Sequence, residues 1–165
     1  MAIRKIVKVG DPVLRQKCRP VEKFDARLHT LIDDMIDTMH HADGVGLAAP
    51  QVGILRRVVV IECVEGEILE LVNPKIIAFS GHQYTEEGCL SFPDEWLFTD
   101  RPMHITVRYQ NRKGEECEIT ASDFLAKALS HEIDHLDGKV MHCRRAPDDK
   151  IPQEEPTPRK KRRSK

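Results

Sequence analysis

The order of periodic segments along this chain constrains its fold more than any single residue. Apolar residues recur every three to four positions over residues 25–41, which predicts an amphipathic helix with Asp25 as its N-cap. A second helix is predicted over residues 122–136, followed by an Asp-Gly stop. The intervening sequence is rich in β-branched residues and broken by Gly, Pro and Asn, which predicts strands within residues 56–64, 67–79, 102–110 and 115–120. The order helix, strands, helix favours an α+β fold over an alternating βαβ fold.

Length and charge distribution predict one folded domain with a tail. A chain of 165 residues is long enough for one core and too short for two comfortable ones. Of the 26 Lys and Arg residues, six fall within residues 159–165, and the other 20 stand against 27 acidic residues. From Pro147 onward prolines and charges replace nearly all apolar residues, which is typical of disorder. We therefore expect a catalytic domain over residues 1–146 and a disordered, Pro-rich, basic tail over residues 147–165.

The sequence shows no sign of export or membrane insertion. Its first residues lack the apolar run of a signal peptide, and no later stretch has the length of a membrane span. The five cysteines are odd in number and widely scattered, so a disulfide framework is not expected. We predict a cytoplasmic protein with reduced thiols that binds neither membrane nor DNA.

The motif HEIDHLDG (131–138) carries the strongest chemical signal. On a helix His131 and His135 lie only about 40° apart, one turn above the other. Two imidazoles so placed can bind one divalent ion, while Glu132 can hold the attacking water without being a ligand. Three apolar residues share that side of the helix: Phe124, Leu125 and Ala128. The histidines therefore project from a buried face, where an unpaired imidazole is unfavourable and a metal ion would satisfy it.

The alternative is a pair of hydrogen-bonded core histidines beside a surface Glu132. A chance match to this pattern in a chain of this length is on the order of one in a hundred or less, which favours the metal. A catalytic site usually has three protein ligands and an open position, so a third ligand must lie elsewhere. Cys89 is the best candidate, because it stands in the Gly-flanked segment EEGCLS. Small buried hydrophobes are the expectation for the other cysteines, Cys18, Cys63, Cys117 and Cys143.

Three segments in register resemble a known family. GVGLAAPQ (44–51), EGCLS (87–91) and HEIDHLDG (131–138) together resemble the signature motifs of the peptide deformylases, and the resemblance covers about residues 3 to 142. It implies antiparallel strands packed around a central metal-binding helix, with a further helix near the N-terminus. It also implies a hydrolase of protein biosynthesis that removes the N-formyl group from new polypeptides beginning with formylmethionine and releases formate.

The resemblance assigns roles residue by residue. The ligands of one divalent ion would be Cys89, His131 and His135, with Fe²⁺ the common ion and Ni²⁺, Co²⁺ or Zn²⁺ able to replace it. Glu132 would move the proton, and the Gln51 amide and the Leu90 backbone N–H would stabilise the oxyanion. The residues expected to bind the formylmethionyl peptide are Val45, Gly46, Glu87, Gly88, Phe124, Leu125 and Ala128.

Two features depart from the family pattern. Trp96 stands where many members have an arginine, and it either stacks on the substrate or only packs against the protein. The basic tail has too many prolines for a helix, so it either contacts ribosomal RNA through phosphates or only aids solubility.

Two rival functions stay open from the sequence. One is an HExxH metallopeptidase, which would usually take its third ligand from beyond the helix rather than from Cys89. The other is a metal-stabilised, ribosome-associated protein without activity.

Overall fold

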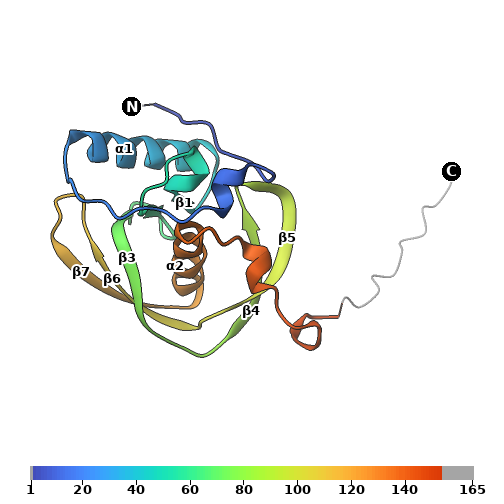
Figure 1. The fold of residues 1–165 in the computed structure, drawn as a ribbon. Coiled ribbons are helices and arrows are strands. Elements are labelled where there is room, and N and C mark those ends of the chain that lie inside the picture. The colour runs from blue at the N-terminus through green and yellow to red at the C-terminus, as the bar shows by residue number, and fades with distance from the viewer. Residues whose placement is uncertain (1, 154–165) are drawn as a thin grey trace.

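The computed structural model describes residues 2–153 and contains two α-helices, with seven strands between them in the sequence (Figure 1). The helices are α1 (Ala26–His41) and α2 (Asp123–Leu136). The strands are β1 (Gly46–Ala48), β2 (Val58–Ile61), β3 (Leu69–Ser80), β4 (Gln83–Cys89), β5 (Phe92–Arg101), β6 (His104–Gln110) and β7 (Glu116–Ser122). Short 3₁₀ helices are η1 (Pro12–Arg15), η2 (Ala49–Val52), η3 (Met141–Arg144) and η4 (Asp148–Lys150). The predicted α+β class is confirmed.

Local chemistry marks the start of α1 and the end of both helices. The Asp25 carboxylate accepts the Leu28 N–H at 3.1 Å, which satisfies a free donor at the start of α1. After α1 the chain turns at Asp43, which has a φ of 54°. Gly138, with a φ of 71°, plays the same part after α2, as its sequence predicted.

The larger sheet is antiparallel throughout, with strand order β1-β2-β3-β6-β7. Successive side chains of a strand point to opposite faces of the sheet, so β2 contributes to the core on both faces. Val58 and Val60 pack in the cluster that contains the apolar face of α1. Val59 and Ile61 pack in the cluster that contains Leu129 and other residues of α2. The edge of the sheet near β1 is therefore clamped between the two helices.

Helix α2 occupies the middle of the molecule. It contacts β1, β2, β6 and β7 of the larger sheet, and β5 of the two-stranded sheet formed by β4 and β5. Figure 1 shows α2 between these two sheets, with α1 along the outer side. Side chains of α2 that face β4 and β5 are consequently enclosed by protein on several sides.

The structure differs from the sequence-based expectation in three strands. We did not predict β1, β4 or β5, which carry the glycines and polar residues of the sequence motifs and so lack a strong apolar alternation. The expected boundary at residue 146 lies within the described part, where η4 and the half-buried Ile151 follow it. Tail residues 154–165 lie outside the described residues. Among the described helices none has the length and apolar character to cross a membrane.

Candidate metal centre

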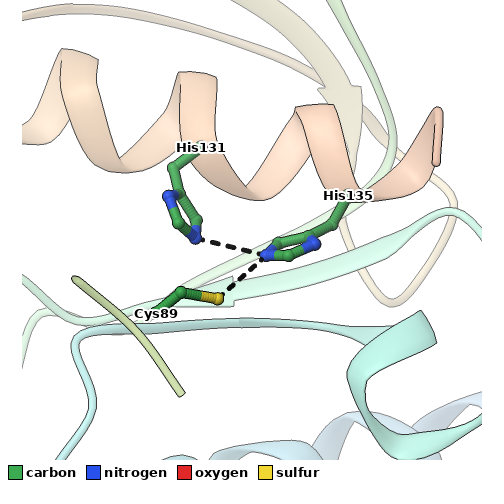
Figure 2. A group of neighbouring side chains, drawn as sticks. All are labelled: Cys89, His131 and His135. Carbon is green, nitrogen blue, oxygen red and sulfur yellow. Dashed lines mark hydrogen bonds between the residues drawn. The ribbon is translucent and has the colours of Figure 1, made fainter. Parts of the chain in front are cut away.

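Cys89, His131 and His135 converge on one point between β4 and α2 (Figure 2). Their nearest ligand atoms all lie within 4.8 Å of one another. His135 Nε2 is 3.4 Å from Cys89 Sγ and 3.2 Å from His131 Nε2. The helical spacing predicted the two histidines on one face, and the fold adds the cysteine from the end of β4.

A break in the β4–β5 pairing places the cysteine. Gly88 is opposite Trp96, but the next pair is Cys89 with Phe92, so the register shifts between them. Three residues of β5 bulge out at this shift, and Asp94 there has a φ of 62°. A bulge of this kind bends a strand and redirects its side chains. The Cys89 side chain is thus directed toward α2 (Figure 2).

The donor set fits a divalent transition-metal ion. A thiol and two imidazoles are ligands for such ions rather than for Mg²⁺ or Ca²⁺. Burial holds the pKa of His135 well below its usual range, so its imidazole is neutral and can coordinate. Burial also lowers the pKa of His131, but the Cys89 thiol and the Glu132 and Glu87 carboxylates outweigh it and raise that pKa to about 10. These surroundings attract positive charge, which a metal ion can supply in place of the proton.

Glu87 lies behind His131, on the side away from Cys89. Its carboxylate pairs with His131 Nδ1, accepts a hydrogen bond from Thr99 Oγ1 at 2.8 Å, and forms an ion pair with Arg101 at 2.6 Å. Burial raises the pKa of Glu87, but the hydrogen bonds from His131 and Arg101 outweigh burial and hold the pKa well below its usual range. The ionised carboxylate therefore fixes the His131 ring with Nε2 toward the metal position.

Arg101 ties this carboxylate to a second one. The Arg101 side chain is fully buried and also contacts Asp134 of α2 and Ser130 Oγ. Arg144 of η3 donates two further hydrogen bonds to Asp134, at 2.9 and 3.0 Å. Buried charges are tolerated only when paired in this way. The network joins β4, β5, α2 and η3 behind the histidines.

Glu132 occupies the opposite, open side of His131. Its Oε1 lies 3.9 Å from His131 Nε2, and its Oε2 is buried without a hydrogen-bond partner among residues 2–153. Burial raises the pKa of Glu132 to about 7. Any Cβ on Gly46 would lie 2.7 Å from Oε1, so the glycine of β1 leaves room for this carboxylate.

Gln51 and Leu90 complete the inner wall. The Gln51 Oε1 accepts a hydrogen bond from the Ala48 N–H at 3.0 Å, which directs the Nε2 end of the amide toward the metal centre. Nε2 then donates to Ser91 Oγ at 3.1 Å and lies 3.5 Å from Cys89 Sγ. A Cβ atom on Gly44 would lie 2.7 Å from the Leu90 side chain, so this glycine leaves room for Leu90.

The N-terminal segment holds these wall residues from outside, and no sequence pattern predicted these contacts. The Val7 N–H donates to the Gln51 carbonyl at 2.7 Å, and the Val9 N–H donates to the Ser91 carbonyl at 2.8 Å. Lys8 Nζ donates to the Leu90 carbonyl at 3.1 Å.

A cleft of about 670 Å³ opens from the centre to the surface. It brings together most of the residues predicted to bind substrate, namely Val45, Gly46, Glu87, Gly88, Phe124 and Ala128. Leu125 instead packs against the core cluster on the sheet side of α2. The sequence reasoning missed Thr99 and Asp134 as parts of the site, although Asp134 lies inside the HEIDHLDG motif on the buried side of its helix.

Two histidines on a buried helix and a cysteine from a neighbouring strand, beside a carboxylate that lines an open cleft, are typical of enzymes in which a metal ion and a general base activate water. Comparison with known proteins agrees: the family model for polypeptide deformylase matches residues 3–150. The chain therefore belongs to the polypeptide deformylase family.

Individual relatives support this membership. A peptide deformylase of Alkaliphilus metalliredigens is 56% identical over 138 residues, which cover 84% of this chain and 93% of that protein. Among solved structures, the peptide deformylase from Thermotoga maritima is similar with a TM-score of 0.86 and 42% identity, covering 89% of this chain and 100% of that one. One from Legionella pneumophila has a TM-score of 0.85 and 46% identity, and the match covers 88% of each chain.

Proposed function

We propose that this chain removes the formyl group from the N-terminal formylmethionine of newly made polypeptides, with Glu132 as its general base. Family membership carries the reaction class. The observation that carries the residue assignment is the buried Glu132 carboxylate next to the Cys-His-His set, since one of its oxygens has no hydrogen-bond partner within residues 2–153. A buried charged group left unpaired destabilises the fold, so its retention favours a chemical role.

Cys89, His131 and His135 would hold one divalent ion, for which we propose Fe²⁺, with Ni²⁺, Co²⁺ or Zn²⁺ as replacements. When bound, such an ion lowers the pKa of water and polarises a carbonyl oxygen. Glu87 orients the His131 ring, and we assign it this role in place of a contact with the peptide, because its oxygens are already paired with His131, Thr99 and Arg101.

Glu132 transfers the proton. Its carboxylate accepts a proton from the attacking water, and the oxygen of that water forms a bond to the formyl carbon. When the carbon–nitrogen bond of the formamide breaks, the same carboxyl group returns the proton to the departing amine. Burial raises the pKa of Glu132, so this carboxylate takes up a proton more readily than an exposed glutamate does.

The oxyanion formed on the former carbonyl oxygen needs donors. Gln51 Nε2 lies within 3.5 Å of Cys89 Sγ, so it is directed at the same point as the ligands. The Leu90 N–H, the next backbone donor after Cys89, is the second donor in this proposal. Ala48 and Ser91 hold the Gln51 amide from both ends, which preorganises it.

The cleft is proposed to bind the peptide in an extended conformation. Val45, Gly46 and Gly88 lie along it and offer strand-like backbone groups. Phe124 and Ala128 form its apolar side for the methionine side chain, while Leu125 supports them from the core side.

The rival functions are less well supported. A metallopeptidase of the HExxH type would be expected to take its third ligand from beyond the helix, whereas Cys89 precedes the helix in the sequence. An inactive binding protein would have no use for a buried unpaired Glu132. Cytoplasmic localisation and a ribosome contact through residues 159–165 stay predictions, and those residues lie outside the described part of the chain.

Formate release tests the proposal. Protein purified without oxygen is loaded with Fe²⁺ or Ni²⁺ and given a short formyl-Met peptide beside the same peptide without the formyl group. Release of formate with no cleavage of the unformylated peptide supports the deformylase. Cleavage of internal peptide bonds would support the metallopeptidase, and a metal-loaded protein with neither activity would leave only the binding protein.

A further inference from the structure

The side chain of Lys8 connects the N-terminal segment to the turn that follows the metal ligand of β4. Its Nζ donates a hydrogen bond to the Leu90 carbonyl at 3.1 Å, although 82 residues separate the two in the sequence. Lys8 also lines the cleft that opens from the metal centre, whereas Lys5 of the same segment does not. Both lysines are exposed, so exposure does not distinguish them. The contact with Leu90 does.

The Leu90 carbonyl lies in a turn that the strand ladder does not hold. Cys89 pairs with Phe92, so Leu90 and Ser91 form the two-residue connection between β4 and β5. The Val9 N–H donates to the Ser91 carbonyl at 2.8 Å and so holds one end of this connection. Lys8 supplies the hydrogen bond to the carbonyl before it. The two contacts fix successive peptide units of the turn.

The orientation of the Leu90 carbonyl affects the Leu90 N–H, which the proposed function assigns to the oxyanion. The N–H and the carbonyl of one residue belong to two planar peptide units that meet at its Cα atom, and only two soft dihedral angles relate them. When the peptide unit after Leu90 is held, these dihedral angles are restricted, and with them the directions open to the N–H. A donor that is already directed at the position of the oxyanion needs no reorganisation when the charge develops.

The charges of the cleft show that this contact is selective. The acidic residues that line it are Asp43, Glu86, Glu87, Asp94, Glu95 and Glu132, and the lysines that line it are Lys8 and Lys127. Lys127 Nζ is bound by the Glu86 carbonyl at 3.0 Å and by Thr85 Oγ1 at 3.1 Å. Lys8 Nζ, in a cleft with so many carboxylates, is directed at a backbone carbonyl next to the metal ligand instead.

We propose that Lys8 is a positioning residue of the oxyanion site: its ammonium group holds the Leu90 carbonyl and thereby directs the Leu90 N–H at the formyl oxygen. It acts through the backbone and is assigned no contact with the metal ion or the peptide. This inference rests on the proposed function, in which the Leu90 N–H stabilises the oxyanion.

The kinetic test removes the ammonium group and then restores a donor. In metal-loaded protein given a short formyl-Met peptide, Lys8→Met should lower kcat about three- to tenfold with KM nearly unchanged, because the oxyanion forms only on the way to the transition state. Lys8→Arg can still donate to the carbonyl and should restore most of kcat. Lys5→Met removes an equal charge from the same segment and should keep the kcat of the parent.

Bound metal and thermal unfolding separate positioning from a general structural role. Both should be the same in Lys8→Met as in the parent, since Lys8 is exposed and is not a ligand of the ion. A loss of metal or stability that accounts for the fall in kcat would overturn the inference. An unchanged kcat in Lys8→Met, or an equal loss in Lys5→Met, would overturn it as well. No formate from the metal-loaded parent would overturn the proposed function, and the role of Lys8 with it.

Nuclear magnetic resonance tests the positioning itself without turnover. In ¹⁵N-labelled protein loaded with diamagnetic Zn²⁺, the order parameter of the Leu90 amide should fall from about 0.85, typical of a rigid backbone, toward about 0.6 in Lys8→Met. It should stay high in Lys8→Arg and Lys5→Met. A Leu90 amide that is as rigid in Lys8→Met as in the parent would contradict the inference, whatever the outcome for formate release.

Discussion

The two sides of the His131 ring differ in how fully their carboxylates are paired. Behind the ring, Glu87 is bound by Thr99, Arg101 and His131 itself, and its pKa lies well below the usual range. On the cleft side, Glu132 is as deeply buried, yet one of its oxygens has no hydrogen-bond partner among the described residues and its pKa is raised to about 7. The paired side can hold a ligand in place, and the unpaired side can exchange a proton.

Burial alone therefore does not decide the role of a carboxylate. Both groups lose most of their contact with water, which raises the pKa of each. Only Glu87 has hydrogen-bond donors, on His131 and Arg101, that lower its pKa by more than burial raises it. Positioning and proton transfer can therefore be assigned to two glutamates that contact the same histidine.

The largest expected effect is on the cleft side. Glu132→Gln keeps the shape of the side chain but removes the base, so kcat should fall at least a hundredfold and up to about ten-thousandfold. The folded protein should be no less stable, because an amide in place of a buried unpaired carboxylate carries no charge to desolvate. Formate release and thermal unfolding measure the two effects. Substantial turnover by metal-loaded Glu132→Gln would show that Glu132 is not the general base.

The next effect is on the paired side. Arg101→Met leaves Glu87 and Asp134 buried without their shared cation, so the free energy of unfolding should fall by about 3–5 kcal/mol. Urea unfolding of the metal-loaded protein measures it. Arg108, whose pair with Glu118 is exposed on β6 and β7, provides the control, and Arg108→Met should change stability by about 0.5 kcal/mol or less. Similar small losses in both variants would show that the network is not structural.

A smaller effect separates orientation from chemistry. Glu87→Gln can still hydrogen-bond His131 but cannot supply a full negative charge, so metal affinity should fall about 10–100-fold. Competition with a chelator, followed by measurement of bound metal, gives the affinity. Unchanged affinity would mean that Glu87 does not orient a ligand.

The smallest effect lies at the outer end of the network. Arg144→Met removes two hydrogen bonds to Asp134, but Arg101 still pairs with that carboxylate. Because Arg144 is 42% exposed, the loss of stability should be about 0.5–1 kcal/mol. A loss as large as that of Arg101→Met in the same urea titration would show that η3 is essential to the network.

Sequence patterns predicted the cleft side of this comparison better than the paired side. The two helices follow from local periodicity, and HEIDHLDG places His131, Glu132 and His135 by helical geometry alone. Arg101 lies 33 residues from its partner Asp134, and such a contact between distant elements leaves no periodic trace. The family resemblance supplied Gln51 and Leu90, and the fold shows that the N-terminal segment holds both.

Two details needed coordinates for a physical reason. Strands β4 and β5 carry polar and charged residues because they line a cleft, so they lack the alternation that marks a half-buried strand. Leu125 shares the helix side of Phe124 on a wheel diagram, but α2 lies between two sheets, and Leu125 packs toward the larger one. Its face could not be assigned without knowing how the helix is enclosed.

The most direct test of the two-sided account measures Glu132→Gln and Glu87→Gln together, for bound metal and for formate released per bound metal ion. If Glu132 transfers the proton, Glu132→Gln should retain the metal and lose nearly all turnover. Glu87→Gln should lose metal to a chelator but keep most of the parent's turnover for each ion it still holds. The reverse result, with metal lost from Glu132→Gln and turnover per ion abolished in Glu87→Gln, would contradict the assignment of proton transfer and positioning to these two glutamates.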